Sequence, residues 1–226
     1  MRLVQRQAVR KSASQSKIIA MSKQFSNHRL RLFRDAYREI MRSVAKSIDL
    51  LNARDTARLL DLLVRERNRR ILIIGVGRSG LIGRAFAMRL MHLGFNVYVM
   101  GETITPAIGR GDLVIVISGS GTTKLAVTAA QIGKEVGARV VAITSFPKSR
   151  LGRLADYVVQ VRGRTKIAKE TDYFTRQITG VFEPLAPLGT IFEIACTVYL
   201  DSLIPELMHR LGLTEQELKH QHATIE

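Results

Sequence analysis

The spacing of apolar residues along the chain differs before and after residue 70. From Asp35 onward, apolar residues recur every three to four positions and charged residues occupy the opposite face, which predicts an amphipathic helix. Asn52 is a favoured N-cap and predicts a second helix, ending at the basic run 65–70. We therefore expect a helical hairpin ahead of the main core.

After residue 70, short apolar runs alternate with helical patterns, as in the βα repeats of a parallel sheet. Gly94 and Gly137 each follow a helical pattern, where a left-handed residue commonly ends a helix. The predicted strands cover 71–74, 96–100, 112–117, 138–143 and 157–161, and the predicted helices between them cover 79–93, 122–136 and 149–155. The fold class that we predict is α/β, a doubly wound five-stranded parallel sheet flanked by helices.

The region that follows the last predicted strand has a different character. Residues 162–182 are polar and basic without clear periodicity, and connections of this length are usually functional or mobile. A long apolar helix is predicted from Leu188 to about Leu203, and Pro205 is expected to kink or restart it. Thr214 and Glu217 have the spacing of a capping box, which predicts a short terminal helix.

The net charge of +16 is concentrated at the start of the chain. Residues 1–34 contain nine of the 35 Lys and Arg residues and no acidic residue. We interpret 1–34 as a basic N-terminal extension and 35–226 as one domain. Aromatic residues are not interleaved with the basic ones, so the pattern does not favour a nucleic-acid partner.

The lengths of the apolar stretches and the number of cysteines indicate where in the cell the protein is expected. No apolar stretch approaches the roughly 20 residues that a membrane-spanning helix needs, so we expect no membrane partner. Cys196 is the one cysteine, and it lies in an apolar pattern typical of a core residue. Without a possible intrachain disulfide, a reducing, cytoplasmic location is expected.

The first candidate site is the glycine-rich turn 75–80, which follows a predicted strand and precedes a predicted helix. Its glycines Gly75, Gly77 and Gly80 satisfy the G-x-G-x-x-G fingerprint of dinucleotide-binding proteins. Glu102 lies 27 residues after Gly75, where a ribose-binding acid would be expected. A dinucleotide-binding oxidoreductase is therefore one alternative, although such a turn also admits other phosphates.

The second candidate site is the segment ISGSGTT at 117–123, which follows the predicted strand 112–117. It presents two serine and two threonine hydroxyls, and its glycines remove steric bulk. Several neutral donors and a helix N-terminus suit a phosphate dianion without burying a cation. Ligands of open α/β sheets collect beyond the carboxyl ends of the strands, where both turns are predicted to lie. The sequence therefore predicts a site for a small monophosphate.

Both turns resemble those of the sugar isomerase (SIS) domain. The stretches GVGRSGLIGRAFAMRLMHLG, VYVMGETITPAI, PLAPLGTIFE and LGLTEQELKHQHATIE are similar to the 6-phospho-3-hexuloisomerase family, and the similarity covers about residues 38–226. The resemblance implies a flavodoxin-like SIS fold and the interconversion of D-arabino-hex-3-ulose 6-phosphate and fructose 6-phosphate through an enediol. It also implies a homotetramer that needs no cofactor and no metal.

The resemblance further implies a set of site residues. Glu193 and His222 are the candidate acid and base, because burial can tune the pKa of a carboxylate or an imidazole toward neutrality. As in related SIS isomerases, a neighbouring subunit can supply the histidine. The implied substrate-binding residues are Gly77, Arg78, Ser79, Glu102, Ser118, Gly119, Ser120, Thr122 and Thr123.

Three departures from the family pattern bear on the substrate. Residues 162–182 match the family poorly and are longer and more basic than usual. Thr122 stands where the family often has glutamate, which removes a carboxylate beside the phosphate site. Thr224 and Ile225 replace the common Asn-Leu near the terminus.

A non-catalytic SIS module that senses a sugar phosphate is a second alternative. The first 70 residues contain no glycine, so the glycine-containing turn of a helix-turn-helix DNA reader is not indicated there.

Overall fold

A computed structural model of the chain describes residues 30–163, 185–187 and 189–220. In chain order the elements are α2 (Arg31–Asp49), α3 (Ala53–Arg65), β1 (Arg70–Gly75), α4 (Arg78–His92), β2 (Asn96–Val99), β3 (Leu113–Ile117), α5 (Lys124–Glu135), β4 (Arg139–Thr144), α6 (Arg150–Leu154), β5 (Tyr157–Gln160), α8 (Thr190–Leu211) and α9 (Glu215–His220). All five predicted strands are present, each within two residues of its predicted ends.

The strands form one parallel sheet in the order β2-β1-β3-β4-β5. Its third strand, β3, is buried along its whole length, as its unbroken apolar sequence requires when helices cover both faces of a sheet. The strand order reverses between β1 and β3, so the chain leaves these neighbours toward opposite faces. The predicted fold class is confirmed.

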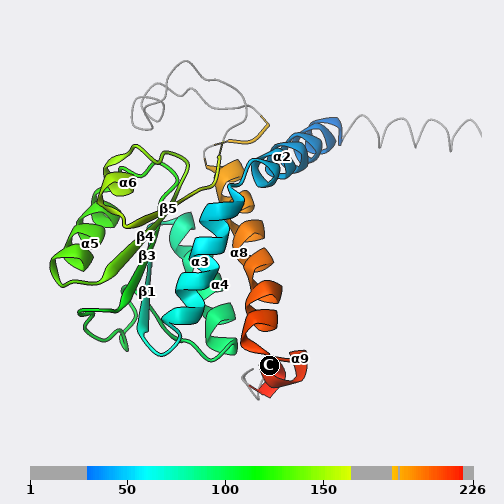
Figure 1. Cartoon of the computed structure of the whole chain (residues 1–226). Coiled ribbons are helices and arrows are strands. Elements are labelled where there is room, and N and C mark those ends of the chain that lie inside the picture. The colour runs from blue at the N-terminus through cyan, green and yellow to red at the C-terminus, as the bar shows by residue number, and fades with distance from the viewer. Residues whose placement is uncertain (1–29, 164–184, 188, 221–226) are drawn as a thin grey trace, which may run out of the picture.

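Two helical layers enclose the sheet, as Figure 1 shows. One face carries α3, α4 and α8, whose apolar residues join alternate residues of the central strands in the larger core cluster. The opposite face carries α5 and α6, and its smaller cluster uses the other alternate residues. Each face therefore takes every second side chain of a strand, as the alternation of side chains in β structure demands.

Helix α8 lies at the centre of the helical layer on its face, because α2, α3 and α4 all pack against it. Of the two predicted effects of Pro205, a kink or a restart, the restart was wrong, since α8 continues without interruption to Leu211. Pro205 is exposed, while the neighbouring Leu203 and Leu207 are buried. A proline costs the helix one hydrogen bond, and the burial on either side of it offsets that loss.

The local signals at the helix ends act as predicted. The Asn52 side-chain oxygen accepts a hydrogen bond from the backbone N–H of Arg54 at 2.9 Å and caps α3. Thr214 N–H donates to Glu217 Oε2 at 2.7 Å, which confirms the capping box. Gly94 and Gly137 both have φ of 79°, the left-handed conformation expected after α4 and α5.

Two regions of the sequence interpretation fall largely outside the structure. Helix α2 begins at Arg31, four residues before the predicted domain boundary, and the extension before residue 30 lies outside the described residues. Of the basic segment 162–182, residues 164–182 lie outside them as well. Among the helices that the structure does describe, none is both long enough and apolar enough to cross a bilayer.

The burial of Cys196 leads to a chemical prediction. Its side chain is fully buried in α8, and this burial, with the charge of Glu193 as a smaller contribution, raises the thiol pKa to about 12. Because the thiolate is the reactive species, the native protein should not react with iodoacetamide at about pH 8. The same protein in concentrated guanidinium chloride should react fully. Mass spectrometry measures both, and rapid native alkylation would contradict the predicted burial.

Candidate functional site

The two sequence-predicted turns lie side by side at the carboxyl edge of the sheet. The parallel register of β1 with β3 ends with Gly75 opposite Ile117. Each strand is followed directly by its turn. The turns 75–80 and 118–123 therefore begin next to each other, at the same height along the sheet edge. This is also the position where the strand order reverses, the usual ligand position in open α/β sheets.

The glycines of the first turn are required by close packing and by backbone conformation. A Cβ on Gly75 would lie 2.6 Å from the backbone carbon of Ser79, which no side chain tolerates. Gly77 caps α4 with φ of 59°, and nothing lies within 4 Å of where its Cβ would be. The chain itself therefore explains this G-x-G-x-x-G pattern, so the pattern does not by itself indicate a dinucleotide. The open space beside Gly77 leaves room for a ligand.

The second turn is organised by hydrogen bonds among its own residues. Ser118 is buried; its Oγ accepts from the N–H of Gly121 at 3.2 Å and donates to Thr123 Oγ1 at 3.3 Å. Ser120 Oγ accepts from the N–H of Thr122 at 3.3 Å. These bonds hold three of the four hydroxyls of the turn, those of Ser118, Ser120 and Thr123, in fixed positions.

Thr122 differs from the other three hydroxyl residues of this turn. Its Oγ1 is buried, and among the described residues it has no hydrogen-bond partner. A buried hydroxyl without a partner costs about 1–3 kcal/mol. An oxygen of a ligand or a bound water would satisfy it. The Thr122 hydroxyl is therefore the one in this turn with unused hydrogen-bonding capacity.

The second turn is also attached to α8 and α6. A Cβ on Gly119 would lie 2.9 Å from the ring of Phe192 in α8, so turn and helix are in close contact. Gly121 has φ of 64°, and its Cβ would lie 2.0 Å from Oγ of Ser149, the residue that caps α6. These contacts place the first turn of α8 beside the hydroxyl-rich turn.

Glu193 lies in that first turn of α8 and pairs with Arg78, the first residue of α4. Arg78 Nη2 is 2.6 Å from Glu193 Oε2, and the Glu193 side chain is 15% exposed. Apart from this contact with Arg78, Oε2 has no hydrogen-bond partner within the described part of the chain. Burial raises the pKa of Glu193, although the charge of Arg78 and a hydrogen bond from it oppose the shift. The result is a partly desolvated carboxylate at the edge of the candidate site.

Two other predicted residues stand apart from this arrangement. Glu102 follows β2, is exposed, and pairs with Arg84 of α4, whose Nε is 3.0 Å from its Oε1. The structure thus places Glu102 on the outer side of α4, in contact with neither turn through any bond that the described residues make. His222 lies outside the described residues. The sequence did not predict the Arg78–Glu193 pair, since nothing in the spacing of residues 115 positions apart indicates it.

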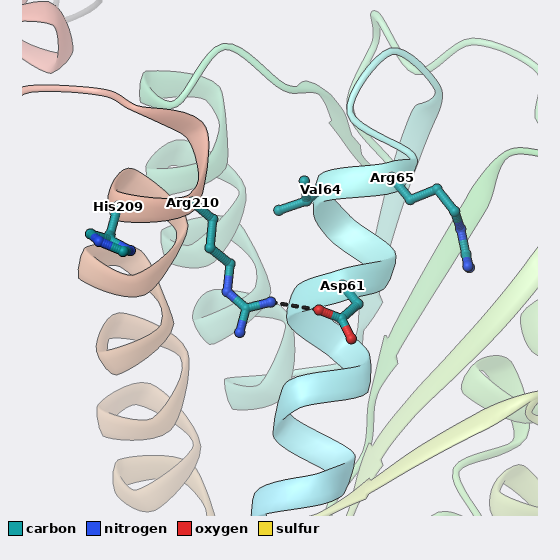
Figure 2. Close-up of a pocket in the computed structure, with 5 residues that line it drawn as sticks. All are labelled: Asp61, Val64, Arg65, His209 and Arg210. Atoms are coloured by element: carbon teal, nitrogen blue, oxygen red, sulfur yellow. Dashed lines mark hydrogen bonds and ion pairs between the residues drawn. The ribbon is translucent and has the colours of Figure 1, made fainter.

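A separate groove lies between α3 and the end of α8, as Figure 2 shows. Its lining residues are Asp61, Val64, Arg65, His209 and Arg210. Asp61 and Arg210 form an ion pair at 2.6 Å, and α3 leads into the amino end of β1, so this groove is at the opposite edge of the sheet from both turns. It contains none of the predicted residues, and we assign the candidate site to the turns.

The donor set of the candidate site suits an anion better than a metal. The two turns supply hydroxyls and peptide N–H groups, with Arg78 as the cation beside them. Within the described ranges, no group of three or more His, Cys, Asp or Glu side chains could hold a metal ion. Phosphate oxygens match hydroxyl and amide donors at a helix N-terminus.

Comparison with known proteins identifies the family. The family model described as SIS domain matches residues 63–179, a little over half of the chain. The chain belongs to the SIS domain family. The matched segment contains both glycine-rich turns and all five strands, but not α8, which carries Glu193.

Several relatives within the SIS family have similar lengths. An uncharacterized protein of Aeropyrum pernix is 59% identical over 74% of this chain and 78% of its own. The 3-hexulose-6-phosphate isomerase of Bacillus subtilis is 34% identical over 83% of this chain and 96% of its own. That of Methanocaldococcus jannaschii is 38% identical over 74% of this chain and 82% of its own.

Solved structures agree with this assignment. A crystal structure of a protein from Methanococcus jannaschii, whose molecular function is inferred to be that of a 3-hexulose-6-phosphate isomerase, covers 83% of this chain and 99% of its own. It has 34% sequence identity and a TM-score of 0.68. A phosphoheptose isomerase from Francisella tularensis, with 13% identity and a TM-score of 0.61, shows the shared fold alone.

The close contact at Gly121 can be tested by substitution. Gly121→Ala adds a methyl group against Ser149 and also forces a non-glycine residue into a positive φ, which costs about 1–2 kcal/mol by itself. We expect a total loss of about 3 kcal/mol or more in the free energy of unfolding. Gly212→Ala is the matched control, because Gly212 has φ of 67° but nothing within 4 Å of its Cβ position. Denaturant unfolding measures both, and equal losses would contradict the packing at the turn.

The raised pKa of Glu193 predicts a pH-dependent effect on stability. Because burial disfavours the carboxylate, ionising Glu193 destabilises the fold above its raised pKa, and this penalty disappears below the ordinary glutamate pKa of about 4.3. Glu193→Gln should therefore raise Tm at about pH 8 by up to roughly 2–4 °C and leave Tm unchanged near pH 4. Asp201→Asn, at an exposed position of the same helix, should show no such gain. A lower Tm for Glu193→Gln at pH 8 would mean that attraction to Arg78 outweighs burial.

Proposed function

We propose that the chain is a phosphosugar isomerase that interconverts D-arabino-hex-3-ulose 6-phosphate and fructose 6-phosphate. The observation that carries the proposal is the partly buried carboxylate of Glu193 next to a hydroxyl-rich turn at the carboxyl edge of the sheet. Relatives named 3-hexulose-6-phosphate isomerase, 34–40% identical to this chain, support the choice of reaction.

The phosphate group would occupy the space between the two turns. Ser120 and Thr123 supply hydroxyls there, and Thr122 supplies the buried hydroxyl that lacks a partner among the described residues. The N-termini of α4 and α5 follow the two turns, and their dipoles favour a dianion at this edge. The neutral donors hold the phosphate without a buried cation, and the half-exposed Arg78 lies beside them.

The sugar would then lie toward the first turn of α8. In the forward reaction a base removes the proton from C2 of the hexulose, and a donor protonates the oxygen on C3, which gives the cis-enediol. Loss of the proton from the C2 oxygen and addition of a proton at C3 complete the change to the C2 ketone. Glu193 is the proposed base for the carbon-bound proton, because its desolvated carboxylate is more basic than an exposed one.

A second group must donate a proton to the oxygen on C3 and later accept one from the oxygen on C2. His222 is the proposed donor, and it lies outside the described residues. An imidazole suits this role because its ordinary pKa of about 6.5 allows it to donate and accept protons near neutral pH. Glu102, which is exposed and paired with Arg84, remains a proposed contact of the sugar hydroxyls at the outer rim.

The proposal is tested by incubating the purified protein with fructose 6-phosphate and following the 3-hexulose phosphate by NMR. Glu193→Gln should lower kcat by about 10²–10⁴-fold, the usual contribution of a general base, while fructose 6-phosphate still binds. Asp201→Asn is the matched control, because it neutralises an exposed carboxylate two turns further along α8.

Three outcomes of this assay are distinct. Turnover that is lost in Glu193→Gln and kept in Asp201→Asn supports the assigned base. Turnover that survives Glu193→Gln shows that another group removes the proton. Binding of fructose 6-phosphate by the wild-type protein without any turnover would replace the isomerase by a sugar-phosphate-sensing module.

A further inference from the structure

The ion pair between Arg78 and Glu193 is unequal in its exposure. The Arg78 side chain is 50% exposed, whereas the Glu193 side chain is 15% exposed and its Oε1 lies against Gly189, 2.9 Å from where a Cβ on that residue would be. The carboxylate is therefore held by its surroundings, while the guanidinium has solvent on one side. If the pair separates, Arg78 is the partner that moves.

Arg78 is also placed to meet a ligand. It is the first residue of α4 and follows Gly77, beside which there is open space. A guanidinium has five N–H donors in a planar fork, and the one ion pair that Arg78 makes within the described residues uses Nη2. The remaining donors suit bidentate contact with the oxygens of a phosphate.

Among the described residues, Arg78 is the one charged group that acts on the pKa of Glu193. The segment 161–163 packs against Phe192, and its one charged side chain, Arg162, is exposed. On α8 itself, burial raises the pKa of Cys196 to about 12, so its thiol is neutral near pH 7. From α3, Asp55 and Thr56 act on Tyr199, which lies further along α8. The buried polar side chains of α2 are serines, and the turn 118–123 carries no ionisable side chain. Losing Arg78 would leave the carboxylate without a compensating positive charge from the described residues.

We propose that Arg78 changes partners when a phosphorylated ligand binds, so that the guanidinium leaves Glu193 for the phosphate. In the free protein the ion pair keeps Glu193 ionised and ready to accept a proton. In the complex the carboxylate loses its cation in a partly desolvated position and becomes a stronger base at the step that needs one. This inference rests on the proposed function for its catalytic meaning, but not for its effect on proton binding.

The exchange is measurable without turnover. Sulfate is a suitable probe, because it is a dianion that does not itself titrate near neutral pH. Calorimetry at about pH 6 in buffers of different ionisation heats should show that wild-type protein takes up a fraction of a proton, at most about one, per bound sulfate. Arg78→Met should show essentially no uptake, because its Glu193 has no cation to lose. Arg89→Met is the matched control, since Arg89 forms the other α4–α8 ion pair, with Asp201 at 3.8 Å, and should behave like wild type.

Kinetics provide the second measurement. The pH dependence of kcat/KM reports the free protein and that of kcat reports the complex. In wild type, the acid limb of kcat should lie at least about one pH unit above that of kcat/KM, because activity is lost as Glu193 becomes protonated. In Arg78→Met the acid limbs of kcat and kcat/KM should coincide at the higher of the two wild-type pH values. Arg78→Lys, which keeps a positive charge, should restore part of the separation.

The exchange of partners is overturned if wild-type protein binds sulfate without proton uptake, or if Arg78→Met takes up as much as wild type. The proposal is also contradicted if the acid limbs of kcat and kcat/KM coincide in the wild-type protein. Thermal unfolding of Arg78→Met against Arg89→Met checks that both variants are folded, and the wild-type measurements alone suffice if Arg78→Met is not. Absence of any turnover by wild-type protein would remove the proposed reaction, and the sulfate experiment would still decide whether Arg78 changes partners.

Discussion

Parallel pairing of β1 with β3 is the constraint on which the candidate site depends. The register that ends at Gly75 and Ile117 sets both turns at the same level of one sheet edge. A shift of this register by one residue would exchange the faces of β3, whose side chains are buried on both sides, so two cores hold it in place. The position of the hydroxyl groups relative to the first turn is thus determined by the burial of apolar side chains some distance below them.

Helix α8 completes the site from a distant part of the sequence. Its apolar surface packs against α2, α3 and α4, which fixes its axis on the sheet, and its first turn reaches the edge where β3 ends. Phe192 fills the space beside Gly119, and the next residue, Glu193, meets Arg78. Burying a carboxylate costs stability, and a protein accepts such a cost where the raised pKa serves chemistry.

The glycines of the two turns have separate physical reasons. Gly75 and Gly121 lie where a Cβ would overlap other atoms of the chain, so they are needed for packing whatever the ligand. Beside Gly77 there is open space, and the buried hydroxyl of Thr122 lacks a partner among the described residues. Only these last two features point to something outside the chain. The SIS family supplies the class of ligand, and Thr122 is where this member departs from the usual sequence of the turn.

Much of the fold was predictable from the sequence, because the signals involved are local. Short apolar runs indicated every strand, 3.6-residue periodicity indicated the main helices, and Asn52 and Thr214 marked helix starts. The dense hydroxyls of 118–123 predict an anion site. Tertiary structure alone decided three matters: the continuity of α8 through Pro205, the burial of the Thr122 hydroxyl, and the pairing of Arg78 with Glu193. Each depends on atoms brought together by packing between elements far apart in the chain, and local hydrogen bonding and side-chain periodicity carry no information about such contacts.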